Sequence, residues 1–239
     1  NVARNGSFRD ANVTALVWDL NTKKNTYNLS GDFKYSYIKG VEDKKGINSQ
    51  LNFSETSGKY RYGVGADITT KDFDPNDLGL NFETNYYSIY GNTSYRILNP
   101  TKYFNSFSAN LNVYSQFQKE TGKIQSSSIV FKINSTNKKN HYFGMGFDAN
   151  PVETFDYYEP RTADRFVIKP TKIGGFIYIS TNYNNSFAID LNPSFTLYDE
   201  SGRNSYGFSV GPRYRFNDKL SLNYNFNFLR QNNNKGYID

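Results

Sequence analysis

The sequence predicts an all-β fold: an antiparallel transmembrane β-barrel, of which about twelve strands lie within residues 1–239. Apolar residues occupy alternate positions throughout 185–229, which is the period of a β-strand. The runs last roughly eleven to thirteen residues, against ~5–6 in a soluble strand and ~9–11 in a tilted membrane strand. The chain also holds 21 Tyr and 20 Phe, which suits a lipid-facing band flanked by aromatic girdles.

The C-terminal strands carry the clearest pattern. They are expected at 187–198, 205–216 and 220–228, and tight turns at 199–203 and 217–218 separate them. Alternating runs joined in this way predict a meander of antiparallel hairpins. A soluble β-sandwich also alternates, so strand length and turn pattern are what favour the membrane barrel over that alternative.

The remaining strands precede this meander. Residues 1–11 show no alternation of apolar and polar residues and are expected to form a loop or an inward-lying segment. Segment 82–98 is aromatic on both faces, which is compatible with a β-bulge that switches the register. The strands expected before the meander are 12–20, 27–38, 47–54, 60–69, 82–98, 104–118, 124–134, 141–149 and 173–182.

The connections differ in length according to their parity. The longest ones, 39–46, 70–81 and 150–172, all belong to the same alternate set, whereas the other set contains short turns. Outer-membrane barrels have short periplasmic turns and longer extracellular loops, and a soluble sandwich has no reason to sort its loops in this way. The polar ending after 230 predicts that the chain continues past Asp239 and that the barrel is larger than these strands alone.

Composition excludes several classes of protein. The mean hydropathy is −0.73, and no run approaches the ~18 apolar residues of a transmembrane helix. The absence of Cys and the single His leave no cofactor or metal site to predict. The net charge of +6 comes from scattered residues, so nucleic acid is not an expected partner.

Three segments carry a resemblance to a known family: ARNGSFRDANVTAL at 3–16, DYYEPRTADRF at 156–166 and RQNNNKGYID at 230–239. The chain resembles the barrel region of Bacteroidota outer-membrane proteins in which a module similar to family 9 carbohydrate-binding modules precedes a barrel of uncharacterised function. The resemblance implies a bacterial outer-membrane location, lipid as a partner and a glycan-related role. It supplies no catalytic residues.

The long connection 150–172 is the first candidate site. Its residues proposed to contact a glycan or a partner are Tyr157, Tyr158, Glu159, Arg161 and Arg165. Aromatic faces and the guanidinium fork suit sugar rings and acidic groups. The alternative is a self-packed loop in which Glu159 pairs with Arg161 or Arg165.

Inward-facing charges form the second candidate site. Arg213, Arg215, Lys132 and Arg96 are expected to line the lumen, where they would tune the selectivity of a pore. The alternative is a network that braces the barrel interior.

An enzyme is not expected. His141 lacks a recognisable nucleophile partner, since Ser135 and Asp148 are poorly spaced from it. The acidic run 70–77 hints only weakly at calcium, and a plain polar loop is the alternative. Gly63-x-Gly65 and Gly144-x-Gly146 indicate crowded strand positions rather than phosphate loops.

Together these features predict a barrel for the passage or docking of material at the bacterial surface. The alternative is a structural subunit that anchors other domains or subunits of a secretion or surface complex.

Overall fold

A computed structural model of the chain describes residues 9–76, 83–162 and 165–235. Within these ranges thirteen strands form one sheet, and two short strands form a separate hairpin. Neighbouring strands within the described ranges pair in antiparallel orientation, so the all-β antiparallel class predicted from the sequence is confirmed. Across the described ranges, no helix is long and apolar enough to span a membrane.

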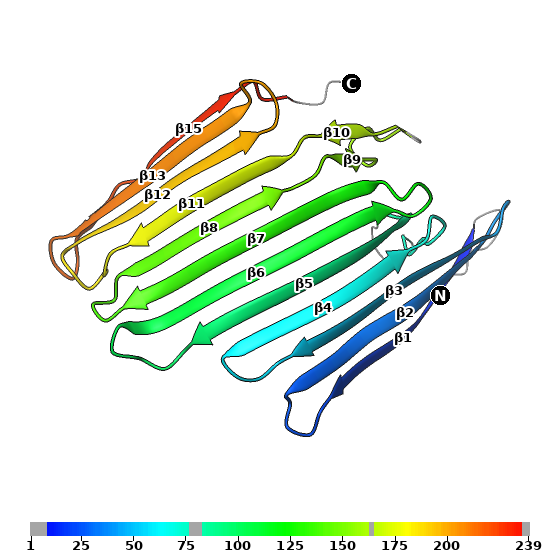
Figure 1. The fold of residues 1–239 in the computed structure, drawn as a ribbon, viewed down its shortest axis with the longest axis horizontal. Coiled ribbons are helices and arrows are strands. Elements are labelled where there is room, and N and C mark those ends of the chain that lie inside the picture. Colours follow the sequence, from blue (N-terminus) through cyan, green and yellow to red (C-terminus); the bar gives the residue numbers. More distant parts are fainter. Residues whose placement is uncertain (1–8, 77–82, 163–164, 236–239) are drawn as a thin grey trace. The chain divides into compact units, whose positions relative to one another are not determined.

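The strand order of the large sheet is nearly sequential, β1 to β8 and then β11 to β14, and β15 also pairs with β13. Figure 1 shows β1 to β4 side by side, and likewise β8, β11, β12 and β13. The bounds are β1 (Asp10–Asn21), β2 (Tyr27–Lys39), β3 (Lys44–Glu55), β4 (Tyr60–Thr69), β5 (Tyr86–Ile97), β6 (Phe104–Gln118), β7 (Ile124–Asn137), β8 (Tyr142–Asn150), β11 (Lys172–Ser180), β12 (Phe187–Tyr198), β13 (Asn204–Arg215), β14 (Ser221–Asn223) and β15 (Phe226–Asn232). The small hairpin is β9 (Thr154–Asp156) with β10 (Val167–Lys169).

The chain divides into two compact units, and the long strands β5, β6 and β7 contribute to both. Unit 1 contains 1–92, 113–127 and 154–169, and unit 2 contains 93–112, 128–153 and 170–239. Within unit 1, β1 to β4 form an uninterrupted meander. Within unit 2, β8, β11, β12 and β13 follow the same pattern.

Most of the expected strands are confirmed, and β4, β6 and β12 have the predicted bounds. The strand expected at 82–98 begins instead at Tyr86, and Phe82 lies outside the described residues. At the place proposed for a register switch, exposed Tyr87 and Ile89 flank buried Ser88. Of segment 1–11, expected to be a loop or an inward-lying segment, residues 1–8 lie outside the described residues, whereas Asp10 and Ala11 already belong to β1. The last four residues of the chain also lie outside the described residues.

Two expectations need correction. The single strand expected at 220–228 is divided into β14 and β15, although both keep one register against β13. The break lies opposite Pro212, which has no N–H to donate to the ladder, while Tyr224 still donates its N–H to the Pro212 carbonyl at 3.0 Å. The connection 150–172, expected to lack strands, contains the β9–β10 hairpin.

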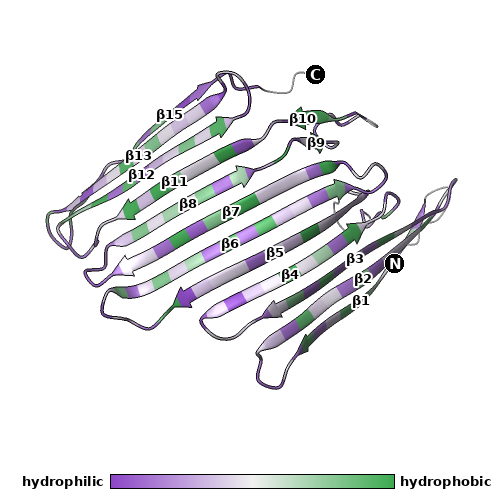
Figure 2. Ribbon diagram, in the orientation of Figure 1, coloured by the Kyte–Doolittle hydropathy of each residue, from purple (hydrophilic) through white to green (hydrophobic). Residues whose placement is uncertain are grey.

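Burial in the sheet is inverted relative to that of a water-soluble protein. Among the described residues the buried apolar side chains are few, namely Ala11, Ile38, Phe73 and Ala188. Buried polar residues outnumber them: Asp32, Ser36, Thr69, Ser88, Gln116, Gln118, Gln125, Ser127 and Thr154. Large apolar side chains such as Phe33, Leu51 and Val64 are exposed. Figure 2 shows the alternation of hydrophilic and hydrophobic bands along the strands.

In unit 1 the segment 70–76 folds back over the polar face of the sheet. The N–H of Asp74 donates to the Ser36 hydroxyl at 3.1 Å, and the Asp74 carboxylate pairs with Arg9 at 2.9 Å. Phe73 is buried directly against Gly46, where an added Cβ would lie 2.1 Å from the Phe73 backbone. The segment therefore sits where it does because position 46 lacks a side chain.

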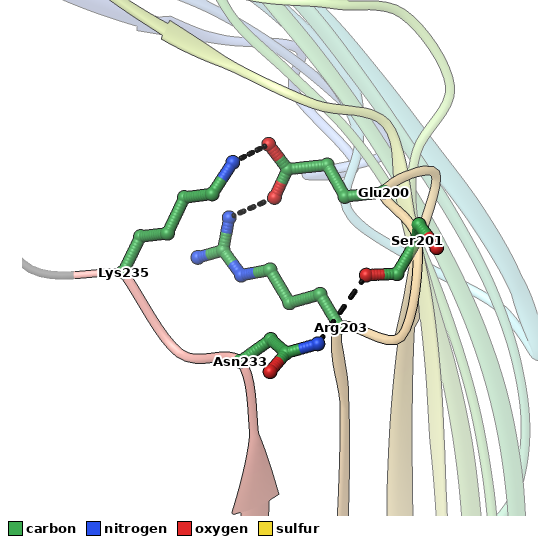
Figure 3. A network of polar contacts seen from close by, with 5 residues as sticks. All are labelled: Glu200, Ser201, Arg203, Asn233 and Lys235. Atoms are coloured by element: carbon green, nitrogen blue, oxygen red, sulfur yellow. Dashed lines mark hydrogen bonds and ion pairs between the residues drawn. The ribbon is translucent and has the colours of Figure 1, made fainter.

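In unit 2 a polar network ties the residues after β15 to the β12–β13 turn (Figure 3). The Glu200 carboxylate accepts from Arg203 at 2.8 Å and from Lys235 at 2.6 Å. Asn233 donates to the Ser201 carbonyl at 3.4 Å. The hydrogen bond from Lys235, followed by that from Arg203, holds the pKa of Glu200 below its ordinary value. The network holds Asn233 and Lys235 against the β12–β13 turn.

The contact at Gly46 can be tested with a single methyl group. Gly46→Ala is expected to displace segment 70–76, because the new Cβ would overlap the Phe73 backbone, and to destabilise this packing by roughly 1–3 kcal/mol. Chymotrypsin cleavage after Phe73 should then become faster. Gly40→Ala is the matched control, since its added Cβ would find its nearest atom at an ordinary 3.7 Å. Equal cleavage rates in the two variants would show that the segment does not depend on the glycine.

Candidate functional site

The candidate site is built on the β9–β10 hairpin, which belongs to unit 1. The ring of Phe166 packs against Phe155 at 5.2 Å and against Tyr157 at 5.4 Å between centroids. The ammonium of Lys123, from the β6–β7 turn, lies 4.5 Å from the Phe155 ring and 4.3 Å from the Phe166 ring. These cation–π contacts attach the hairpin to the neighbouring turn.

Asp156 organises the turn that follows β9. Its Oδ1 accepts the backbone N–H of Tyr158 at 2.8 Å and that of Glu159 at 3.0 Å, and its Oδ2 pairs with Lys169 on β10. Burial alone would raise the pKa of Asp156, but the bonds from Lys169 and the two N–H groups outweigh it, so the pKa is lowered from 3.8. Because the pKa of Asp156 is lowered on folding, its ionised form stabilises the loop at every pH above the ordinary pKa. This stabilisation is lost as the pH falls through the lowered pKa.

Tyr158 connects the hairpin to the sheet. Its hydroxyl donates to the Thr84 carbonyl at 2.8 Å and lies 3.4 Å from the Gln125 side-chain oxygen. Burial raises the pKa of this hydroxyl far above its ordinary 10.0, and the Glu83 carboxylate adds to the rise. The phenol therefore keeps its proton, and the contact is intact at every pH below about 10, the ordinary tyrosine value.

A pocket of about 800 Å³ opens between this hairpin and the adjoining ends of the strands. It is lined by Lys71, Thr84, Asn85, Gln118, Glu120, Gln125, Tyr157, Tyr158, Arg161 and Thr162. The volume lies within the range of known ligand sites, ~300–1,000 Å³. All of these residues belong to unit 1.

Arg161 has an unusual backbone conformation, with φ of 50°. Four other described non-glycine residues have positive φ, and all of them are Asn, a residue that tolerates this region: Asn25, Asn85, Asn140 and Asn233. For an arginine the conformation costs roughly 1–2 kcal/mol. The surrounding turn holds it there through the Arg161 N–H, which donates to the Tyr158 carbonyl at 3.1 Å.

Three of the five loop residues proposed from the sequence line the pocket, namely Tyr157, Tyr158 and Arg161. Glu159 and Arg165 are exposed and do not line it. Among the described residues, Glu159 forms no ion pair with Arg161 or Arg165, so the alternative of a loop ordered by that pair does not apply. Asp156 and Lys169 supply the ion pair instead. Asp164 lies outside the described residues.

The proposed lumen residues all belong to unit 2, and two of them contact the β11–β12 turn. The guanidinium of Arg213 lies 5.4 Å from the Tyr183 ring, and Arg215 donates to the Asn184 carbonyl at 2.8 Å. These contacts favour the bracing interpretation for this pair. Arg96 and Lys132 form no ion pair with the residues that the structure describes.

The other residues considered from the sequence as catalytic or metal-binding groups, His141 and the acidic run 70–77, contact neighbouring parts of the protein. Nδ1 of His141 accepts the Asn182 N–H at 3.1 Å, which places the imidazole against the β11–β12 turn. Asp74 of the acidic run is paired with Arg9, and Asp77 lies outside the described residues. No group of three or more potential metal ligands occurs in 9–76, 83–162 or 165–235. The proposed crowding at Gly65 and Gly146 is confirmed, since aromatic rings lie against both.

Sequence reasoning missed the part of the pocket that the sheet contributes. Gln118 and Gln125 flank the β6–β7 turn and are buried, and Lys71 and Glu120 face each other at 3.8 Å. The sequence did contain a signal for them, because two long amide side chains at inward-facing positions on either side of one turn are unusual. That these residues line one pocket with 157–161, however, depends on contacts between segments that are far apart in the sequence.

The fold and the pocket define an antiparallel β-sheet protein with a loop-covered polar site. A family model described as a domain of unknown function, DUF5916, matches residues 1–239, so the chain belongs to this family. Comparison with curated proteins and with solved structures gives no match.

The role of Asp156 predicts a difference between two substitutions. Asp156→Ala removes both the turn acceptor and the ion pair and is expected to destabilise the loop by about 1–2 kcal/mol. Asp156→Asn keeps an acceptor oxygen and loses only the partly exposed ion pair, which is worth about 0–1 kcal/mol. Trypsin cleavage after Arg161 or Arg165 should accelerate strongly in the first variant and little in the second. Equal acceleration would mean that the ion pair, rather than the turn, holds the loop.

Tyr158 and Tyr157 provide a second matched pair. Tyr158→Phe leaves the Thr84 carbonyl without its donor and should weaken the loop by about 1 kcal/mol. The result should be faster amide hydrogen exchange over 154–162. Tyr157→Phe should leave exchange unchanged, because the Tyr157 hydroxyl forms no hydrogen bond with a described residue. Identical exchange in both variants would contradict the anchoring role of Tyr158.

Proposed function

We propose that the chain forms a membrane-spanning β-sheet of a bacterial outer-membrane protein, as part of a barrel. The observation that carries the proposal is the inverted burial, with large apolar side chains exposed and polar side chains buried. Soluble monomers rarely expose contiguous apolar patches larger than a few hundred Å². A hydrocarbon environment removes this cost, which in water is about 25 cal/mol per Å².

Strand length supports the same environment. β2 has 13 residues, β6 has 15 and β12 has 12, whereas a tilted strand needs about 9–11 to cross the hydrocarbon core. β2 is paired along nearly its whole length with β1 on one side and with β3 on the other. Lipid requires this saturation because it offers no partner for free N–H and C=O groups.

The proposed role at the membrane is the docking or passage of polar material at the cell surface. The pocket on the hairpin side of unit 1 supports docking, because it joins aromatic rings, amides and charges in one cavity. The alternative role, an anchor for other subunits, predicts no conductance step in planar bilayers and no uptake of solutes into liposomes. A conductance step from the full-length protein would favour passage.

The membrane proposal can be tested with Trp18, the single tryptophan of the chain. Trp18 lies opposite Gly31, between the exposed residues Leu16 and Leu20, on the apolar face. In bilayers that contain brominated acyl chains, its fluorescence should be strongly quenched. The β-sheet circular dichroism signal and heat-modifiable gel migration should require detergent.

The matched control moves the indole by one residue to the opposite face, in a Trp18→Phe/Asp19→Trp double variant. Since neighbouring strand residues point to opposite faces, quenching should be nearly absent in it. A chain that folds cooperatively in plain buffer, or equal quenching in both proteins, would overturn the membrane proposal.

A further inference from the structure

The pocket in unit 1 is suited to a ligand rich in hydroxyl groups. Its polar lining is mostly uncharged, with the amides of Asn85, Gln118 and Gln125 and the hydroxyls of Thr84 and Thr162. Amides both donate and accept hydrogen bonds, as sugar hydroxyls do. Gln118 is oriented by its own loop, because its Oε1 accepts the Thr121 N–H at 2.8 Å. The amide is thus held in place before a ligand arrives.

Aromatic rings complete the surface. Tyr158 is fixed through its hydroxyl to the Thr84 carbonyl, and Tyr157 is packed against Phe166. Both rings line the pocket, and neither depends on a ligand for its position. Rigid aromatic rings beside neutral amides can contact the apolar C–H face of a sugar while the amides bind its hydroxyls.

The charges favour a ligand that also carries an anionic group. Lys71 faces Glu120 at 3.8 Å, so these two charges largely offset each other. The guanidinium of Arg161 has no ion pair with any described residue, and it is the remaining charge of the lining. Its planar fork matches a carboxylate in a bidentate arrangement.

The backbone of Arg161 provides an independent observation. It is the one described residue other than Asn and Gly that is held at positive φ, a conformation in which glycine would be more stable. Strained positions of this kind cluster at ligand-binding sites. This backbone conformation therefore occurs at the one charged residue of the described lining that has no ion pair.

We propose that this pocket binds an acidic saccharide, with the Arg161 guanidinium on the sugar carboxylate and with Gln118 and Gln125 on the hydroxyls. The inference deepens the proposed docking function and rests on it for access to the pocket from outside the cell. A uronic acid oligomer is the class of ligand that this combination of groups fits.

The test is isothermal titration of the full chain in detergent micelles with trigalacturonate and with its methyl ester, which has the same rings and no negative charge. The acid should bind, and the ester should bind at least about tenfold more weakly, as expected for the loss of a charge-assisted hydrogen-bond pair. Arg161→Gly should weaken acid binding to a similar extent. It should also leave the fold intact or more stable, because glycine suits φ of 50°.

Lys59→Ala is the control variant, since it removes one exposed positive charge from the β3–β4 turn of the same unit, away from the pocket lining. It should bind trigalacturonate as the wild type does. The inference is overturned if the acid does not bind, if acid and ester bind equally, if Arg161→Gly binds normally, or if Lys59→Ala weakens binding as much as Arg161→Gly.

The two proposals fail in different ways. A chain that folds in detergent and does not bind trigalacturonate refutes the pocket ligand and leaves the membrane proposal standing. A chain that folds in plain buffer refutes the membrane proposal, and the same titration performed in that buffer then decides the ligand.

Discussion

The structure depends on one constraint, namely that the sheet buries polar side chains and leaves apolar ones exposed. Ser36, Thr69 and Ser88 are almost completely buried, while Phe33 and Val64 are open. Each buried polar group needs a hydrogen-bond partner, because an unpaired one costs about 1–3 kcal/mol. The loops and the neighbouring strands must supply these partners, so the polar face determines where the connections fold.

The two in-folded segments of unit 1 meet this requirement differently. Segment 70–76 brings backbone N–H groups to the sheet, as at Ser36, and needs the space left by Gly46. The β9–β10 hairpin brings the phenol of Tyr158 to a backbone carbonyl and leaves a cavity beside it. The pocket is therefore a consequence of how the hairpin is attached, through few and specific contacts rather than through a continuous apolar core.

Sequence patterns predicted the strands well because a period of two is a local property. They failed where a single residue changed the ladder, as at Pro212, and where a short hairpin lacked a long alternating run, as in β9 and β10. For the site, aromatic and basic residues in an unusually long connection pointed to Tyr157, Tyr158 and Arg161. The same reasoning also selected Glu159 and Arg165, since composition does not show which side of a turn a residue occupies.

By itself the sequence determined the all-β class, the strand order of the meander and the face on which each strand residue lies, because alternation and turn residues act between near neighbours. Only the tertiary structure decided which polar residues meet. Gln118, Gln125 and Lys71 join Arg161 in one cavity through contacts between segments far apart in the chain. The positive φ of Arg161 was likewise invisible, since its own side chain disfavours that conformation and the surrounding turn imposes it.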